Sequence, residues 1–451
     1  MSASTRWSVR SRRDLTLYAL PGLATALPTL PVLVLLPQYY ATATTLSLAS
    51  IGLALLIARL LDMATDPAVG WLMDTVPTRW GRRKPWMLLG GLFAAPALIV
   101  LSLPSADTTL FQLALFLCAL YVGWTFFSIP YNALGAELAR DAYERTRFAS
   151  AREAATLAGI VLASALPVVL KAAGVVTEDQ FFAIAIITIV TGAITITMLL
   201  AVVQEDEHVP PAPVHQTEAQ WRGFFASLKG NTPFVVILSA WFFNGLANGT
   251  GTVLFPFFLS DALKTTDQQK NLLIFLYFFC AIAGLPIWLV LSKHFDKARL
   301  WLCSIIIVSV TFTTVPFLPE GAVLEFGIIC VITGVCLGAD LALPASLFAD
   351  VTDWDELQTK RKRRGILYSS WTLVAKLSLA LAAGFCLPLV GALGFTPGAD
   401  NTPEALTALA VIYALLPVSL KMGVLWLMWR FPITTKAHRS IQRRLEVRER
   451  A

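Results

Sequence analysis

Long apolar runs separated by short polar stretches dominate the 451-residue chain. A helix needs roughly 20 apolar residues to cross a hydrocarbon core about 30 Å thick. Twelve runs approach or exceed that length, and the pattern predicts one transmembrane helix for each. The predicted helices cover residues 14–38, 46–73, 86–104, 109–136, 149–171, 180–203, 232–260, 271–292, 299–317, 323–350, 366–391 and 404–430. We therefore expect an all-α membrane protein.

The predicted helices fall into two sets of six, separated by the longest polar connector. This connector contains EDEHVPPAPVHQTEAQW, whose prolines and charges are typical of a linker. We predict an N-terminal six-helix bundle over residues 1–203, a cytoplasmic linker over 204–231 and a C-terminal six-helix bundle over 232–435. Residues 436–451 are expected to form a cytoplasmic tail.

Composition and charge support a lipid environment. Hydrophobic residues make up 56% of the chain and charged residues only 14%, against about 25% charged in soluble proteins. Most lysines and arginines lie in the tails and in alternate loops, which predicts that both termini are cytoplasmic in a bacterial-type inner membrane. Because the basic residues form short clusters between apolar runs, the net charge of +6 does not indicate a nucleic-acid partner.

The second apolar run carries charges that membrane helices seldom contain. The segment ARLLDMATDPAVGWLMDTVPTRWGRRKPW places Arg59, Asp62 and Asp66 at three- and four-residue spacing, which puts them on one helical face. A charge at the bilayer centre costs from about 2.5 to above 10 kcal/mol, so this face is expected to line an interior cavity.

Asp62 and Asp66 have the properties of a cation site. Two carboxylates one turn apart repel each other when both are ionised, and this repulsion favours binding of a proton or of a hard cation such as Na⁺. The alternative is a structural ion-pair network in which Arg59 neutralises Asp62. No cofactor is expected beyond the coupling ion, H⁺ or Na⁺.

Four stretches of the sequence resemble the motifs of a known family. They are the segment just quoted, SIPYNALGAEL with DAYERTRFASAREAATLAG (128–159), WFFNGLANGTGTVLFPFFL (241–259) and ADVTDWDELQTKRKRRGILYSSWTLVAKLSLAL (349–381). Together they resemble the glycoside-pentoside-hexuronide:cation symporter family of the major facilitator superfamily. The resemblance covers nearly the whole chain. It implies a major facilitator fold and cation-coupled symport by alternating access.

The resemblance also implies roles for single residues. Helix II aspartates of the family serve the cation and match Asp62 and Asp66, and a helix IV threonine near the cation matches Thr125. A helix XI lysine close to cation and solute matches Lys376. A helix V sugar-binding arginine matches Arg152, for which charge anchoring is the alternative.

Three sugar-binding positions depart from the best-known sugar carrier of the family. Two aspartates and a tryptophan of that carrier are matched here by Ala26, Ser128 and Asn132. The carboxylate acceptors and the aromatic platform for the sugar are therefore missing. Relatives of the family carry lysolipids, so an amphiphile is an alternative to a sugar, a glycoside or a related small polar solute.

Further polar residues within spans are candidates for solute binding or coupling. Asn244 and Asn248 lie one turn apart and suit hydroxyl groups, although interhelical packing explains them equally well. Asp340 is a replacement solute ligand, a second proton site, the partner of Lys376, or a solvated residue in a water cavity. Two more candidates, Trp371 and Thr372, lie about one helical turn before Lys376 on the same predicted helix.

Charged residues on the cytoplasmic side form a candidate gate. Asp74 precedes Arg82 and Arg83 across a turn at Pro77, and Arg364 ends a run of five basic residues, Lys360–Arg364. These residues are expected to join helices at the inner face, with a plain positive anchor as the compatible alternative. Because Arg364 replaces a glutamate usual in the family, an inner-gate ion pair with that glutamate is not expected.

Other function classes lack their sequence signals. The chain contains no GxxxxGK[ST] phosphate loop for a primary pump. All four histidines lie in loops or tails, without HExxH or a Cys/His cluster, so no catalytic residues and no metal site beyond Na⁺ are expected. We expect a monomeric symporter whose partners are a small solute, a cation and the lipid bilayer. A sensor or scaffold that kept the fold is the alternative of a different class.

Overall fold

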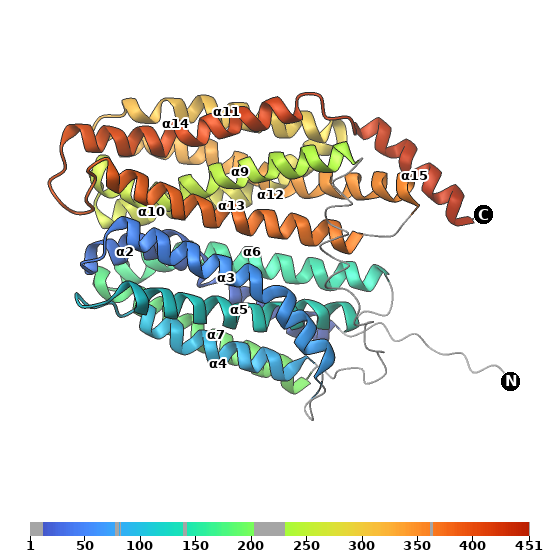
Figure 1. The fold of residues 1–451 in the computed structure, drawn as a ribbon, viewed down its shortest axis with the longest axis horizontal. Helices are drawn as coiled ribbons and strands as arrows, with labels where there is room; N and C mark the ends of the chain where they lie inside the picture. Colours follow the sequence, from blue (N-terminus) through green and yellow to red (C-terminus); the bar gives the residue numbers. More distant parts are fainter. Residues whose placement is uncertain are drawn as a thin grey trace. The chain divides into compact units, whose positions relative to one another are not determined.

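The computed structural model describes residues 12–76, 81, 83–138, 142–202, 231–360 and 364–450. Helices form the regular structure of these residues, and no strand occurs among them (Figure 1). Twelve helices within the described part are long and apolar enough to cross a membrane, which confirms the twelve predicted spans. The chain is therefore a multi-pass membrane protein.

The first six spans precede the predicted linker, which lies outside the described residues except for Asn231. They consist of α1 (Arg12–Ala26), the π-helical η1 (Pro31–Leu35) and α2 (Leu36–Ala43), then α3 (Leu48–Thr75), α4 (Lys84–Leu101), α5 (Leu110–Leu138), α6 (Ala142–Ala172) and α7 (Thr177–Val202). In the first span, the π-helical residues begin at Pro31, which has no backbone N–H to donate to an α-helical ladder.

The last six spans follow Asn231, whose side chain accepts a hydrogen bond from the backbone N–H of Phe234 and so caps the first of them. They are α9 (Thr232–Phe257) with the π-helical η2 (Phe258–Ala262), α10 (Asp267–His294), α11 (Lys297–Thr313) with the 3₁₀ turn η3 (Val315–Phe317), α12 (Val323–Thr359), α13 (Arg364–Ala392) and α14 (Pro403–Met428). A further helix, α15 (Thr435–Arg450), lies beyond the last span.

Helix α12 continues past its predicted end at residue 350. Its last turns are polar, which is why hydropathy alone ends the span too early. The structure pairs these polar groups with neighbouring elements: Lys297 Nζ lies 2.8 Å from an oxygen of Asp350, and Asn231 Nδ2 donates to Asp355 at 2.6 Å. Polar pairing therefore supports the helix beyond the end of its continuous apolar run.

The chain forms two compact units. Unit 1 comprises Met1–Val32, Ala64–Pro104 and Leu115–Val214, and unit 2 comprises Leu33–Met63, Ser105–Ala114 and His215–Ala451. The boundary passes through α3, so the predicted bundle limits at residues 203 and 232 stay a prediction. In unit 1, a buried cluster around Tyr18, Phe127 and Tyr131 joins α1 to α5. In unit 2, a larger cluster joins α9, α11, α12 and α14.

Helices α10 and α12 approach each other closely within unit 2. A Cβ added at Gly334 would lie 2.6 Å from the carbonyl oxygen of Tyr277, and one at Gly338 would lie 2.6 Å from that of Ala281. Only glycine allows the two backbones to come this near. The close packing sets Tyr277 of α10 beside Asp340, which follows Gly338 on α12.

Candidate functional site

The aspartate Asp62 of α3 lies in an ion pair inside unit 2. Its side chain is 1% exposed, and its Oδ2 lies 3.0 Å from Nζ of Lys376 on α13. Nη1 of Arg59, one turn earlier on α3, lies 3.7 Å from the same oxygen. The structure thus brings together three residues that the sequence singled out, and one buried carboxylate faces two cations.

Asp66 follows one turn later on α3 and has a different partner, within unit 1. Its Oδ1 accepts a hydrogen bond from Oγ1 of Thr125 on α5, over 3.1 Å. Thr125 is fully buried, whereas Asp66 is half-buried. This contact joins two of the three residues that the family resemblance assigns to the cation.

A second polar cluster of unit 1 is centred on Arg152 of α6. The guanidinium of Arg152 donates to Oδ1 of Asn132 on α5 and lies 2.6 Å from a carboxylate oxygen of the exposed Glu153. The structure therefore unites the predicted pair Arg152 and Asn132. Ser128 lies one turn before Asn132, and its side chain makes no hydrogen bond to a residue within the described ranges.

An aromatic pair of unit 1 involves α1 and α5. The hydroxyl of Tyr18 donates to the backbone carbonyl oxygen of Tyr131 over 3.2 Å, and the hydroxyl of Tyr131 donates to the backbone carbonyl oxygen of Tyr18 over 2.5 Å. Their rings lie 4.8 Å apart. These reciprocal bonds fix both phenols in place, and a lone tyrosine in the sequence gives no sign of them.

Asp340 of α12 is the centre of a buried hydrogen-bond network in unit 2. Its Oδ1 accepts from Nε1 of Trp301 at 2.6 Å. Its Oδ2 accepts from Asn248 at 3.0 Å and from Asn244 at 3.3 Å. Nζ of Lys421 on α14 lies 3.4 Å from Oδ2 and donates to Oδ1 of Asn244 over 2.9 Å. Four helices, α9, α11, α12 and α14, thus meet at one carboxylate.

The network changes the roles considered for Asp340. Its cationic partner is Lys421 and not Lys376, because Lys376 faces Asp62 on α3. In the sequence analysis, Lys421 had no role and was not paired with Asp340. The signal was available: each is the isolated charge of an apolar stretch, and two such charges of opposite sign stabilise one another in a bundle.

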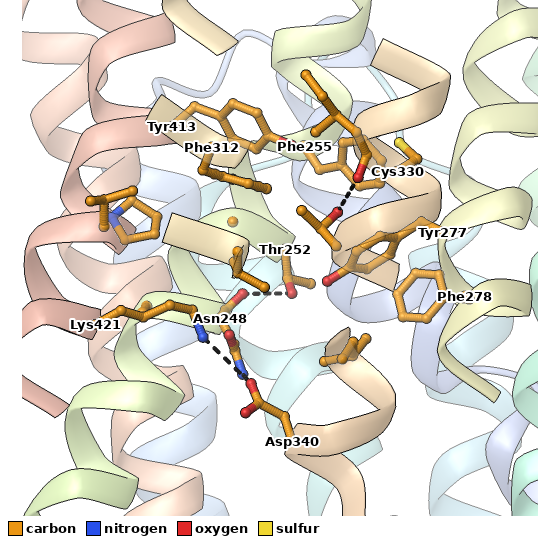
Figure 2. A pocket seen from close by; sticks show the side chains of 18 of the residues that line it. Asn248, Thr252, Phe255, Tyr277, Phe278, Phe312, Cys330, Asp340, Tyr413 and Lys421 are labelled. Atoms are coloured by element: carbon orange, nitrogen blue, oxygen red, sulfur yellow. Dashed lines mark hydrogen bonds and ion pairs between the residues drawn. The ribbon is translucent and has the colours of Figure 1, made fainter. Parts of the chain in front are cut away.

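A cavity of about 50 Å³ lies against this network (Figure 2). Asp340, Lys421 and Asn248 form its polar end, and aliphatic and aromatic side chains form most of the remaining wall. The aromatic lining includes Phe255, Tyr277, Phe278, Phe312, Phe326 and Tyr413. The volume is far below the roughly 300 Å³ at which ligand pockets usually begin. The cavity therefore suits small polar groups and not a whole sugar ring.

The remaining solute candidates lie on α13. The ring of Trp371 stacks on that of Trp241 of α9 at 4.3 Å and 10°, and packs against Phe348 at 4.5 Å. Thr372 is exposed, and its hydroxyl donates to the carbonyl oxygen of Tyr368 within the helix. The structure thus places an aromatic pair near the start of α13, one that inspection of single positions did not identify.

The candidate gate is described only in part. Nη2 of Arg83 lies 2.6 Å from a carboxylate oxygen of Glu137 on α5, so this arginine joins α4 to α5 within unit 1. The side chains of Asp74 and Arg364 and the whole of Arg82 lie outside the described part of the chain. Glu137 is a gate partner that sequence reasoning missed, although it occurs in the quoted SIPYNALGAEL motif.

Comparisons of the sequence and the fold with known proteins identify the family of the chain. The family described as MFS/sugar transport protein matches residues 17–435. The chain belongs to this family. Its fold agrees with that of a solved D-xylose-proton symporter, with a TM-score of 0.65, 15% identity and coverage of 94% of this chain and 99% of the other. The major facilitator fold and the family resemblance inferred from the motifs are both confirmed.

Two relatives of the chain are named for different solutes. The sodium-dependent lysophosphatidylcholine symporter 1 of Gallus gallus is 24% identical, over 88% of this chain and 81% of the relative. The glucuronide carrier protein homolog of Escherichia coli (strain K12) is 20% identical, over 90% and 89%. Membership therefore establishes a transporter of the major facilitator superfamily, while the two relatives correspond to different solute classes.

Proposed function

We propose that the chain is a cation-coupled symporter that moves a sugar, a glycoside or a related small polar solute by alternating access. The observation that carries this proposal is the buried Asp62 carboxylate facing Lys376, with Asp66 one turn further along α3. Either H⁺ or Na⁺ is the coupling ion. The protein acts in a bacterial-type inner membrane, as a monomer with both termini in the cytoplasm.

Coupling follows from competition for one carboxylate. A cation that binds at Asp62 and Asp66 competes with the ammonium of Lys376 for Asp62, because both are attracted to the same oxygen. Lys376 is 21% exposed at its side chain and can turn toward a solute once the cation has replaced it. A solute that holds Lys376 away from Asp62 strengthens cation binding by the same factor.

The solute side of the proposal rests on hydrogen-bonding groups in unit 1. Arg152 and Asn132 offer several donors and one amide oxygen, and the side chain of Asn132 is exposed. Such groups suit hydroxyls or a uronate carboxylate. The named function of the glucuronide carrier homolog agrees with this class of solute.

An amphiphile is the second candidate solute, favoured by a groove in unit 1. The groove has a volume of about 580 Å³ and an almost wholly apolar lining from α4, α5 and α7. Leu92, Trp124 and Ile196 are among its lining residues. An acyl chain suits such a wall, and the name of the lysophosphatidylcholine symporter agrees with an amphiphilic solute.

The experiment is uptake by proteoliposomes that contain the purified chain. Sugars, glycosides, uronates and a lysophosphatidylcholine are offered with a Na⁺ gradient, a pH gradient or neither. Accumulation of a polar solute that requires one gradient supports the proposal, and accumulation of the lysolipid alone supports the second candidate. Uptake that ignores both gradients contradicts symport.

A pair of variants tests the proposed cation site in the same assay. Asp62→Asn is expected to abolish gradient-driven accumulation because the neutral amide binds a cation weakly. Asp107→Asn removes a carboxylate from an exposed loop and is expected to leave uptake unchanged. If Asp62→Asn accumulates solute as the wild-type protein does, the proposed cation site is wrong.

A further inference from the structure

The helix α15, beyond the last span, packs on the rest of unit 2. Ile433, just before α15, and Ile441 are buried in the core cluster that also contains Val351 of α12, and Leu445 packs against that cluster. The other face of α15 is exposed and basic, with Arg439, Arg443 and Arg444. Apolar contacts thus hold one face of this helix, and the helix lies at the C-terminal end of the chain (Figure 1).

His438, near the start of α15, lies between two carboxylates of α12. Its Nδ1 is 3.4 Å from Oδ1 of Asp350, and its Nε2 is 3.0 Å from Oδ2 of Asp353. The histidine side chain is 12% exposed, and those of Asp350 and Asp353 are 5% and 19% exposed. The imidazole is therefore largely shielded from water, with an acidic oxygen at each ring nitrogen.

This arrangement depends on the charge of the ring. A neutral imidazole has one N–H donor, whereas the imidazolium has two. In the neutral form one nitrogen presents its lone pair to a carboxylate oxygen, so that this contact turns repulsive. Only the protonated ring attracts both Asp350 and Asp353.

The other charged groups around the ring are few among the described residues. Lys297, at the start of α11, lies 2.8 Å from Asp350, so it shares that carboxylate with His438. Asp350 and Asp353 are the titratable groups of α12 in contact with the ring. Arg439 is the adjacent charge on α15 itself and is exposed. Lys297 thus contacts Asp350, whereas the ring contacts both Asp350 and Asp353.

We propose that His438 is a pH-dependent latch that holds α15 on the end of α12. Protonated His438 is hydrogen-bonded to Asp353 through Nε2 and pairs its charge with Asp350 through Nδ1, and these contacts dock the helix. Loss of the proton removes the ionic attraction to the two carboxylates and weakens the docking. Histidine side chains ordinarily change charge between about pH 5 and 8. The latch is therefore closed at the acid end of this window and opens as the pH rises on the side of the membrane that holds the C-terminus.

The latch acts on the same helix that carries the polar network around Asp340. Helix α12 carries Asp350 and Asp353 near its end and Asp340 earlier in the same helix. Docking of α15 therefore restrains the helix that also carries Asp340. The latch needs no solute or coupling ion, so it can be tested whether or not the proposed transport activity is correct.

The test is amide hydrogen exchange of the full chain in lipid nanodiscs. Protection factors of residues 435–445, corrected for the intrinsic exchange rate, are compared at about pH 5 and about pH 8. We expect about tenfold greater protection at the lower pH, the effect of one charge-assisted hydrogen bond in a partly exposed site. Equal protection at both pH values in the wild-type protein would overturn the proposal without any variant.

Variants separate the latch from a general effect of pH. His438→Gln retains hydrogen bonding but cannot gain a charge, and Asp353→Asn removes one acidic acceptor. Both are expected to lose most of the tenfold difference. His294→Gln changes an exposed histidine at the end of α10 and is expected to retain it. A tenfold difference that persists in His438→Gln would assign the pH response to another group and overturn the proposal.

Discussion

The buried pair of Asp340 and Lys421 allows a quantitative test of the structure. Asp340→Asn removes the only carboxylate in contact with Lys421 among the described residues and leaves an ammonium whose side chain is 6% exposed. Breaking a buried ion pair by removing one partner costs about 3–5 kcal/mol, because the remaining charge is uncompensated. We expect Asp340→Asn and Lys421→Met each to lower the free energy of unfolding by that amount.

The double variant distinguishes an ion pair from two unrelated polar residues. Asp340→Asn with Lys421→Met removes both charges at once, and the asparagine oxygen still accepts from Trp301 or Asn248. The double variant is therefore expected to lose less stability than the two single variants together, with a coupling of about 1–3 kcal/mol. Chemical unfolding in mixed micelles, followed by tryptophan fluorescence, measures each value.

An exposed pair supplies the matched control. Nζ of Lys264 lies 2.7 Å from Glu320, but the two side chains are 56% and 59% exposed. Such surface pairs contribute about 0–1 kcal/mol, so Glu320→Gln is expected to change stability little. If the losses of Asp340→Asn and Lys421→Met simply add in the double variant, the claim that these residues neutralise one another is wrong.

Two further predictions concern the cation residues and the helix packing. Thr125→Val removes the hydrogen bond to Asp66. Because one hydrogen bond contributes a net free energy of about 1 kcal/mol, the cation affinity is expected to fall about fivefold to tenfold in a cation titration. Thr407→Val, on an exposed turn of α14, is the control and is expected to leave the affinity unchanged. Gly334→Ala forces apart α10 and α12 and is expected to lower the free energy of unfolding by about 1–3 kcal/mol. Gly423→Ala is the control, because no atom outside the adjoining helix backbone lies within 4 Å of the added Cβ, and it is expected to cause no measurable loss of stability.

The spans were predictable because hydropathy alone determines them. An apolar run of membrane length has one low-energy structure in lipid, a helix that satisfies its own backbone groups. Helix ends beyond the apolar core depend on other interactions. The extension of α12 to Thr359 rests on partners such as Lys297 and Asn231, which are distant in sequence. Hydropathy has no access to such pairs, and it underestimated this helix.

The candidate site shows the same division between local and distant information. Spacing placed Arg59, Asp62 and Asp66 on one helical face because the period of a helix is fixed. The pairing of Lys421 with Asp340 joins α14 to α12, and no local rule specifies it. A charge within a span indicates that a partner exists, but only the packing of the helices identifies that partner.

Accessibility separates the two buried ion pairs of unit 2 by function. Asp340 accepts hydrogen bonds from Trp301, Asn244 and Asn248 besides Lys421, and so many donors hold the carboxylate in one position. A transported ion at this pair would have to displace several donors in a closed site. Lys376 is 21% exposed at its side chain against 6% for Lys421, so a cation can replace Lys376 on Asp62 at lower cost. We therefore propose that the coupling ion acts at Asp62 and that Asp340 stabilises the helix bundle.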